Sequence, residues 1–357
     1  MSSNIIHYDG GLTYLPHPDG ERDEEQRLYL PYIPDKELIE AVNLAIDLHR
    51  PLLLEGEPGC GKTRLAGAVA YELTKKVRER GKEGIEENFW YPYYTWNIKS
   101  TSKVRDGLYR YDAVNRLRDT QIVGADPTRL EAFLDTSETE KFEKLRSELK
   151  QVIKRLMDWE NSYFQFGSLG KALQPENDYR PILLVDEIDK ADNDFPNDLL
   201  LELDEFRFDI PERGESLPPP SQDREPIIFI TSNRGKPLPD AFLRRCIYYY
   251  LEFPSEDRLR EIIRQRFTSL DKSYDEVITL AIERFYKVRG VLELQPGGRP
   301  PGTSEFLDFL TVIIKKAQGT SLDEAMGFLE NLSEHKPELG LLLKSKADQD
   351  LYRESLD

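Results

Sequence analysis

One stretch near the N-terminus decides the fold of this chain: Leu52-Leu53-Leu54-Glu55-Gly56-Glu57-Pro58-Gly59-Cys60-Gly61-Lys62-Thr63. Its leucines predict a short buried strand, and residues 56–63 match the pattern G-x-x-x-x-G-K-[ST] without a mismatch. Gly59 and Gly61 let backbone N–H groups turn inward around phosphate oxygens, where a Cβ would obstruct them. A helix is predicted from about residue 62 to residue 77. Strand, glycine-rich loop and helix in this order indicate a phosphate-binding loop.

The side chains of this loop have distinct predicted roles. Lys62 reaches the β- and γ-phosphates of a nucleotide, and the Thr63 hydroxyl ligates Mg²⁺. The helix that follows points its positive N-terminus at the anion. The predicted nucleotide-binding residues of the loop are Gly56, Glu57, Pro58, Gly59, Cys60, Gly61, Lys62, Thr63 and Arg64. Cys60 is interpreted as a small filler residue, and a redox switch is the alternative.

A second apolar strand ends in two carboxylates, in the stretch Ile182-Leu183-Leu184-Val185-Asp186-Glu187. A buried strand delivers Asp186 to the carboxyl edge of the sheet beside the loop, where it can hold Mg²⁺ through water. Glu187 can polarise a water for in-line attack on the γ-phosphorus. Adjacent carboxylates are common by chance, but together with the loop they predict a nucleotide hydrolase.

Polar residues also follow the apolar strand predicted at residues 227–231. Asn233 can orient the attacking water or touch the γ-phosphate, and its alternative role is that of a turn residue. Arg244 and Arg245 end a short helical stretch twelve residues further on. They are either a solvated pair or a pair that reaches the nucleotide of a neighbouring subunit.

The remaining apolar runs extend the same architecture. Further strands are predicted at 93–98 and 247–253, and helical patterns separate most of the strands. This alternation predicts an α/β fold with a parallel sheet covered by helices. After residue 254 the predicted elements are amphipathic helices only, at 258–267, 276–288, 304–317, 322–332 and 338–346.

The patterns divide the chain into three parts. Residues 1–27 form an irregular N-terminal arm, residues 28–254 the α/β core, and residues 255–357 a smaller helical lid. The core carries a helical insertion at about 128–160, in which residues 141–159 form an amphipathic helix.

Composition excludes several other classes of protein. The chain has 357 residues with a net charge of −17, so it would repel nucleic acid unless its basic residues cluster. No apolar run approaches the roughly 18 residues of a membrane span, and no signal peptide is predicted. Its two cysteines exclude a disulfide framework and indicate a cytoplasmic protein.

In the order of its motifs the chain resembles AAA+ ATPases, and within them the MoxR-like group. The motifs are Walker A at 56–63, Walker B at 183–192, sensor 1 at Asn233, the arginine-finger segment at 238–245 and the stretch 166–173. The resemblance covers residues 28–310, and the motif set is more specific for AAA+ than for MoxR.

The resemblance implies a P-loop NTPase αβα core with a five-stranded sheet, a helical lid, and a ring, usually a hexamer, with ATP and Mg²⁺ at subunit interfaces. Arg245 takes the finger position and acts in trans with Arg244 as its helper, which contributes about 10³ to 10⁵ in rate. Tyr32 and Ile33 fall where relatives line the adenine pocket; alternatively they anchor the arm. Asn97 matches a polar residue that restrains the catalytic glutamate in some relatives.

One segment departs from the group. Sensor 2 of the group carries an arginine at the start of a lid helix, but residues 301–306 contain none and place Glu305 at or beside that position. Arg299 is the nearest substitute, and it can equally be an ordinary loop charge.

The resemblance implies a chaperone-like ATPase that remodels or assembles a client protein, as relatives do for proteins with von Willebrand factor A domains. Tyr109 and Tyr111 are candidates for client contact, because AAA+ proteins place pore elements there. Two alternatives stay open: a slow nucleotide-gated scaffold in a signalling or defence assembly, which the missing arginine favours, and an ATP-dependent nucleic-acid loader. The basic residues at 258–266 alternate with acids, so nucleic acid is the less favoured partner.

Overall fold

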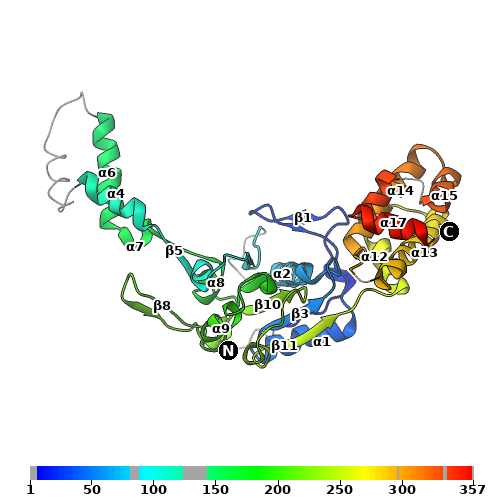
Figure 1. Cartoon of the computed structure of the whole chain (residues 1–357). Coiled ribbons are helices and arrows are strands. Elements are labelled where there is room, and N and C mark those ends of the chain that lie inside the picture. Colours follow the sequence, from blue (N-terminus) through cyan, green and yellow to red (C-terminus); the bar gives the residue numbers. More distant parts are fainter. Residues whose placement is uncertain (1–5, 81–87, 124–142, 296, 333–335, 356–357) are drawn as a thin grey trace.

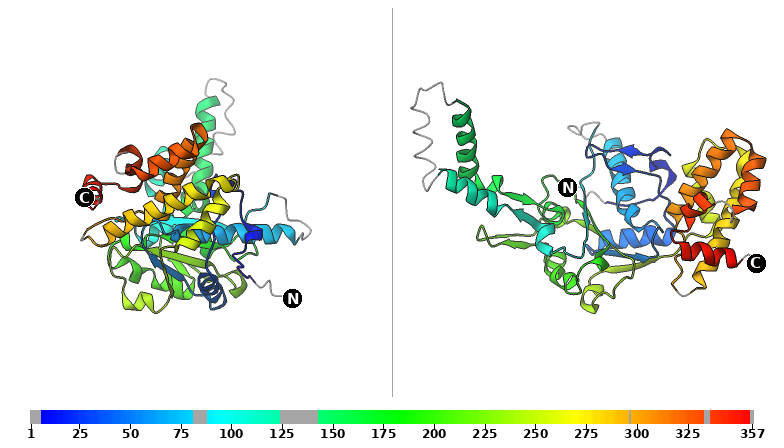
Figure 2. Two further views of the ribbon diagram at one scale, coloured as in Figure 1. Left: turned by 90° about the vertical axis from the view of Figure 1, so that its right-hand side faces the viewer. Right: turned by 45° about the horizontal axis from the view of Figure 1, so that its top comes forward.

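The computed structural model describes residues 6–80, 88–123, 143–295, 297–332 and 336–355. An α/β core lies between a C-terminal helical lid and a stalk that carries α4 (Ala113–Val123) and α6 (Glu143–Met157) away from it (Figure 1). The second view in Figure 2 keeps the stalk and the lid at opposite ends of the core. Within the described residues, none of the helices has the length and apolar character that a membrane span requires.

The core is built on a five-stranded sheet in the order β11-β3-β10-β7-β4. Its strands are β3 (Leu52–Gly56), β4 (Tyr93–Asn97), β7 (Ile182–Asp186), β10 (Ile227–Ser232) and β11 (Ile247–Leu251). Every pairing in this sheet is parallel. The predicted fold class, an αβα core with a parallel five-stranded sheet followed by helices, is confirmed.

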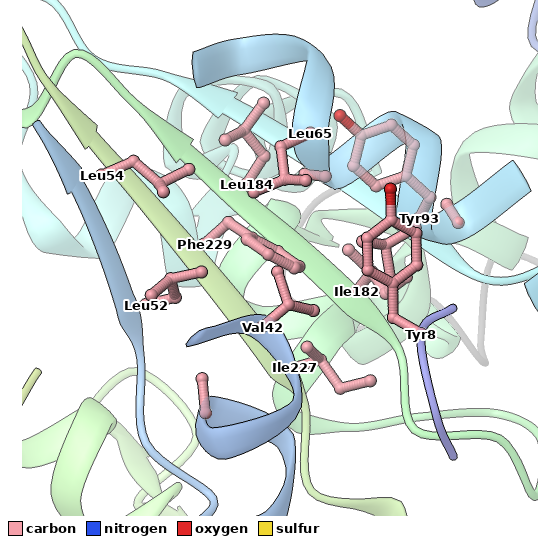
Figure 3. Packing of buried hydrophobic residues seen from close by; sticks show 14 of the residues in the cluster. Tyr8, Val42, Leu52, Leu54, Leu65, Tyr93, Ile182, Leu184, Ile227 and Phe229 are labelled. Atoms are coloured by element: carbon pink, nitrogen blue, oxygen red, sulfur yellow. The ribbon is translucent and has the colours of Figure 1, made fainter. Parts of the chain in front are cut away.

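Both faces of the sheet are covered because its strands are apolar on both sides. Leu52 and Leu54 of β3 pack with Val42 of α1 (Lys36–Asp47) and Leu65 of α2 (Lys62–Glu79), as Figure 3 shows. Leu53 between them belongs to the cluster on the opposite face, as expected from the alternation of side chains along a strand. The other core elements are η3 (Ile188–Lys190), α9 (Phe195–Asp198), α10 (Leu200–Glu205), β8 (Phe208–Ile210), β9 (Glu215–Leu217), η4 (Gln222–Arg224) and α11 (Asp240–Leu243).

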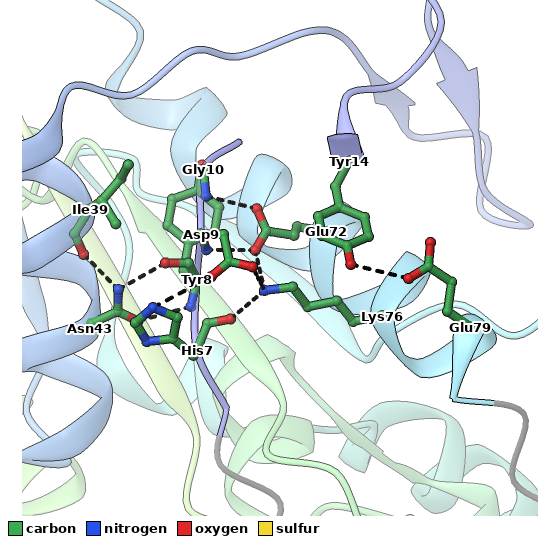
Figure 4. A network of polar contacts seen from close by, with 10 residues as sticks. All are labelled: His7, Tyr8, Asp9, Gly10, Tyr14, Ile39, Asn43, Glu72, Lys76 and Glu79. Atoms are coloured by element: carbon green, nitrogen blue, oxygen red, sulfur yellow. Dashed lines mark hydrogen bonds and ion pairs between the residues drawn. The ribbon is translucent and has the colours of Figure 1, made fainter. Parts of the chain in front are cut away.

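The N-terminal arm is attached to the outside of α1 and α2. It contains η1 (Leu12–Tyr14) and β1 (Glu21–Arg22), and β1 pairs with β2 (Leu28–Tyr29), the first strand after the arm, in a hairpin that the sequence did not indicate. The buried carboxylate of Glu72 accepts hydrogen bonds from the backbone N–H groups of Asp9 (2.7 Å) and Gly10 (2.9 Å), as Figure 4 shows. Asn43 of α1 both donates to and accepts from the backbone of Tyr8. The arm therefore packs as part of the core.

The stalk consists of helices inserted between two paired strands. β5 (Tyr109–Tyr111) follows α3 (Val104–Leu108) and pairs with β6 (Phe164–Phe166), which leads into α8 (Ser168–Leu173). The predicted helix at 141–159 corresponds to α6, followed by α7 (Trp159–Ser162); residues 141 and 142, like the start of the predicted insertion, lie outside the described residues. Asp119 of α4 is buried and accepts from Arg155 of α6 and from the Tyr163 hydroxyl, both at 2.8 Å. This pairing holds the two helices together.

The lid begins directly after the last strand of the sheet. Its elements are α12 (Glu256–Arg266), η5 (Lys272–Tyr274), α13 (Asp275–Glu293), α14 (Thr303–Gly319), α15 (Leu322–Glu330), α16 (Lys336–Leu342) and α17 (Lys346–Glu354). These helices enclose an apolar cluster of their own, centred on Phe285, Phe306 and Phe309. Since this cluster is separate from both faces of the sheet, the lid has its own hydrophobic core.

Candidate functional site

The predicted site residues meet at the carboxyl edge of the sheet. β3, β7 and β10 are neighbours in the sheet, and they end at Gly56, Asp186 and Ser232. The glycine-rich loop, Glu187 and Asn233 follow directly after these ends. Parallel strands thus bring together residues that are far apart in the sequence, as ligand sites in open α/β sheets require.

The loop has the backbone geometry that its glycines predict. Gly59 has φ +80° and Gly61 φ +99°, both in the left-handed region that favours glycine. A Cβ at Gly61 would lie 3.1 Å from the ring of Tyr32. The loop therefore needs glycine at Gly61 for its conformation and for the close approach of Tyr32.

Lys62 is buried at the start of α2, with 6% of its surface exposed. Its ammonium donates to the backbone oxygens of Gly56 and Glu57, both at 2.8 Å. No carboxylate pairs with it in the described part of the chain. A buried cation that lacks a counter-ion is costly, so this position is suited to an anion such as a phosphate group.

The two predicted metal ligands are already in contact. The Thr63 hydroxyl donates to Asp186 Oδ1 at 2.9 Å, and the Thr231 hydroxyl donates to the same oxygen at 2.7 Å. Hydroxyl and carboxylate oxygens are hard ligands of the kind that Mg²⁺ takes alongside water. The residues present therefore fit a magnesium ion. Thr231 is a further residue of this site, and its place at the end of an apolar strand was the one local signal for it in the sequence.

Glu187 is held from several sides at the end of β7. Its carboxylate accepts from Asn233 Nδ2 at 3.1 Å and forms an ion pair with Lys190. Its backbone has φ +59°, an uncommon left-handed conformation for a residue with a side chain, and its N–H donates to the Thr231 hydroxyl. Asn233 is thus in contact with the predicted catalytic carboxylate, as a residue that orients a water would be.

A further carboxylate fixes the position of Asn233. Asp189 is buried and accepts from the backbone N–H groups of Asn233 (3.2 Å) and Gly235 (2.8 Å). In the sequence, Asp189 and Lys190 are distinguished only as part of the Walker B stretch. The three-residue spacing of Lys190 from Glu187 was the one local signal for their ion pair.

A cavity of about 100 Å³ lies where the adenine pocket was predicted. Tyr32 and Ile33 line it, together with the loop glycines and residues of the lid. The Thr303 hydroxyl is buried beside it and has no hydrogen-bond partner among the described residues. Burial raises the pKa of Tyr32 above its ordinary value, so its hydroxyl stays neutral. The cavity thus combines apolar residues and neutral hydroxyl groups with four charged residues, Asp35, Arg64, Glu252 and Arg258.

The two predicted finger residues lie at the surface, directly after α11. The Arg245 guanidinium pairs with Asp204 and donates to the Ala241 oxygen at 2.8 Å. Arg50 donates to the backbone oxygens of both Arg244 and Arg245. Arg244 is exposed. All these contacts lie within one chain, and none involves the loop or Glu187.

The lid contacts the loop through residues other than Arg299. Arg299 is exposed and forms no ion pair with any residue that the structure describes. Glu305 accepts from the backbone N–H of Gly302 at 3.1 Å and thereby caps α14. Arg289 of α13, which no sequence motif marks, donates from its guanidinium to the Glu57 carboxylate in the loop at 2.7 Å.

Two other predicted features lie away from this site or at its margin. Tyr109 is buried, with 3% exposed, and its hydroxyl donates to Glu212 at 2.6 Å, so the expectation that it contacts a client is wrong in this structure. Tyr111 is half-buried and stacks on Phe164. Asn97 is exposed and pairs in register with Asp186.

The thiol inside the loop is held in its protonated form. Burial raises the pKa of Cys60 above the ordinary value of a cysteine, and the neighbouring Lys62 offsets only part of this rise. A protonated thiol is a poor nucleophile. This agrees with the interpretation of Cys60 as a filler residue.

The comparisons with known proteins agree with this geometry. The model of the ATPase family associated with various cellular activities (AAA) matches residues 52–254, from the first strand of the sheet to the start of the lid. A search of the curated proteins finds no match to the chain.

Proposed function

The chain belongs to the AAA family of ATPases, and from this premise we propose that it works as a ring whose ATP hydrolysis remodels or assembles a partner protein. The ring, expected to be a hexamer, would be of the MoxR type, with a client such as a protein bearing a von Willebrand factor A domain. The observation that supports the ATPase site is Lys62, a buried cation that donates to two loop carbonyls and the Cys60 sulfur and has no carboxylate partner among the described residues.

The proposed division of roles follows from the contacts. Lys62 exchanges its bonds with loop carbonyls for bonds with the β- and γ-phosphates, and the backbone N–H groups of the loop surround the same anion. Thr63 and Asp186 would hold Mg²⁺, which would neutralise charge on the phosphate oxygens. Glu187 accepts a proton from the attacking water, and Asn233, in contact with it, orients that water.

The second half of the proposed site comes from a neighbouring chain. Arg245, with Arg244 as helper, stabilises the charge that develops on the γ-phosphate of the adjacent subunit. The surface position of both residues supports an action in trans, as do the printed contacts of Arg245, which are with Asp204 and Ala241 and not with the loop. ADP and inorganic phosphate are the products.

The variant Glu187→Gln tests this proposal, because it keeps the loop and the metal ligands but removes the base. With ATP and Mg²⁺ we expect it to retain nucleotide, to accumulate as a ring in size-exclusion chromatography and to retain its client in a pull-down. The matched control is Lys62→Ala, which should bind little ATP and stay unassembled. A Glu187→Gln chain that binds ATP yet remains monomeric would contradict the ring.

A slow nucleotide-gated scaffold is the second candidate. It is favoured by Glu305, whose carboxylate lies 3.2 Å from where a Cβ of the loop residue Gly59 would be, in the segment where relatives carry a cationic sensor. Turnover per assembled ring separates the two candidates, since a remodelling ATPase turns over repeatedly and a scaffold does not.

A further inference from the structure

Arg289 of α13 is a lid residue whose contacts reach the phosphate loop. It is 3% exposed, and its guanidinium lies 3.6 Å from the centre of the Phe253 ring, in the segment that leads from the sheet into the lid. It donates to the Pro301 oxygen at 2.7 Å, to the Glu293 carboxylate at 2.6 Å and to the Glu57 carboxylate at 2.7 Å. One buried cation therefore connects the lid helix, the segment before α14, and the loop.

Glu57 is the loop residue through which this contact passes. Its carboxylate accepts from Arg289, while its backbone oxygen accepts from the ammonium of Lys62 at 2.8 Å. A movement of the lid that pulls on the carboxylate of Glu57 thus acts on the residue that also holds Lys62. The lid and the phosphate-binding lysine are coupled by two consecutive hydrogen bonds.

The backbones of the lid and the loop also meet. A Cβ on Gly302, the residue before α14, would lie 2.8 Å from the Gly59 Cα and 2.8 Å from the Pro58 oxygen, so only glycine allows this approach. Glu305 caps the same helix start. The first turn of α14 therefore carries a negative charge, that of Glu305. The positive charge that contacts the loop is that of Arg289 on α13.

We propose that Arg289 is the positioning residue that couples the lid to the phosphate loop through Glu57. Its guanidinium is buried and donates to Pro301, Glu293 and Glu57, so it acts on the position of the loop and not on the triphosphate. Loss of the ion pair between Arg289 and Glu57 should therefore loosen the lid. It should weaken the binding of ATP and the binding of ADP to the same degree. An arginine that senses the γ-phosphate would affect ATP alone. The nucleotide part of this inference rests on the proposed function.

Hydrogen exchange of the nucleotide-free chain tests the coupling without any ligand. We compare Glu57→Gln and Arg289→Met with Glu293→Gln, which removes a contact of the same guanidinium but lies on α13 itself. Amides of residues 306–309, the first of α14 that have backbone acceptors, should exchange on the order of ten-fold faster in the first two variants and at the wild-type rate in Glu293→Gln. Unchanged exchange in α15 would verify that the lid core stays folded. Wild-type protection of residues 306–309 in Glu57→Gln would overturn the inference.

Nucleotide affinity provides the second readout, measured in the Glu187→Gln background so that ATP persists. Glu57→Gln should lower the affinities for ATP and for ADP by equal factors, on the order of ten-fold. Adding Arg289→Met should lower these affinities little further. A loss confined to ATP, or additive losses, would overturn the positioning role. If the parent chain binds neither nucleotide, the proposed function fails, and the exchange experiment still decides whether the lid and the loop are coupled.

Discussion

Lys62 and Arg245 are the two cations on which the proposed hydrolysis depends, and they differ in burial. Lys62 is buried, and around it Thr63, Asp186 and Glu187 already form hydrogen bonds with one another or with Thr231. Arg245 is 38% exposed and pairs with a half-exposed carboxylate of its own chain. The loop half of the site is thus assembled within one chain, whereas the arginine half is presented at the surface, where a second chain can meet it.

Among the substitutions considered, replacing Arg245 should lower the ATPase rate most. Arg245→Ala should lower the ATPase rate of the assembled ring by about 10³ to 10⁵, with little change in ATP binding because the loop half is intact. Steady-state kinetics and a binding titration measure the two quantities. Mixing Arg245→Ala with Glu187→Gln chains should restore activity, because some interfaces then combine an intact glutamate with an intact arginine.

The mixing experiment also has an outcome that contradicts the trans arrangement. If Arg245 acts on the nucleotide of its own chain, no interface of a mixed ring is intact and no activity returns. Asp204→Asn is the matched control, because it removes only the surface partner of Arg245. Exposed pairs contribute little, about 0.2–1 kcal/mol, so this variant should change the rate only a few-fold.

Within the loop half, Asn233 should matter more than Lys190, although both contact the Glu187 carboxylate. Asn233→Ala removes a fixed, half-buried donor, and misplacement of a catalytic group by about 1 Å can cost about 10²-fold in rate. Lys190 is exposed, so Lys190→Ala should cost less than about ten-fold. Both predictions concern kcat at saturating ATP; equal losses would show that Asn233 is no more than a turn residue.

The smallest expected effect is a difference in reactivity between the two cysteines. Cys60 lies in the loop beside Lys62, and Cys246 directly follows Arg245. Burial raises the pKa of both thiols, that of Cys246 to about 12, so each stays protonated at pH 7 and becomes reactive only as the pH rises. Alkylation followed by mass spectrometry at pH 7, 8 and 9 should be slower than that of a free cysteine, and slower for Cys246 than for Cys60. Rapid modification of Cys60 at pH 7 would instead favour a redox switch.

Much of the site could be predicted because its signals are local. The loop, Asp186, Glu187 and Asn233 each follow an apolar strand directly, and a parallel sheet brings such strand ends to one edge. Tyr109 was assigned wrongly for the opposite reason: its position after the second strand is local, but its burial depends on the pairing of β5 with β6 and on Glu212. A position in the sequence does not reveal which neighbour covers a side chain.

The sequence by itself determined the class of fold, the glycine-rich loop and the carboxylates beside it, because spacing along the chain sets the alternation of strands and helices and the conformation of the glycine turns. Only the tertiary structure decided that the arm packs on α1 and α2, that Thr231 and Asp189 support the site, and that the lid reaches the loop through Arg289. Arg289 and Glu57 are 232 positions apart. Charges so distant leave no pattern in the sequence, and only the packing of the lid against the core brings them within hydrogen-bond distance.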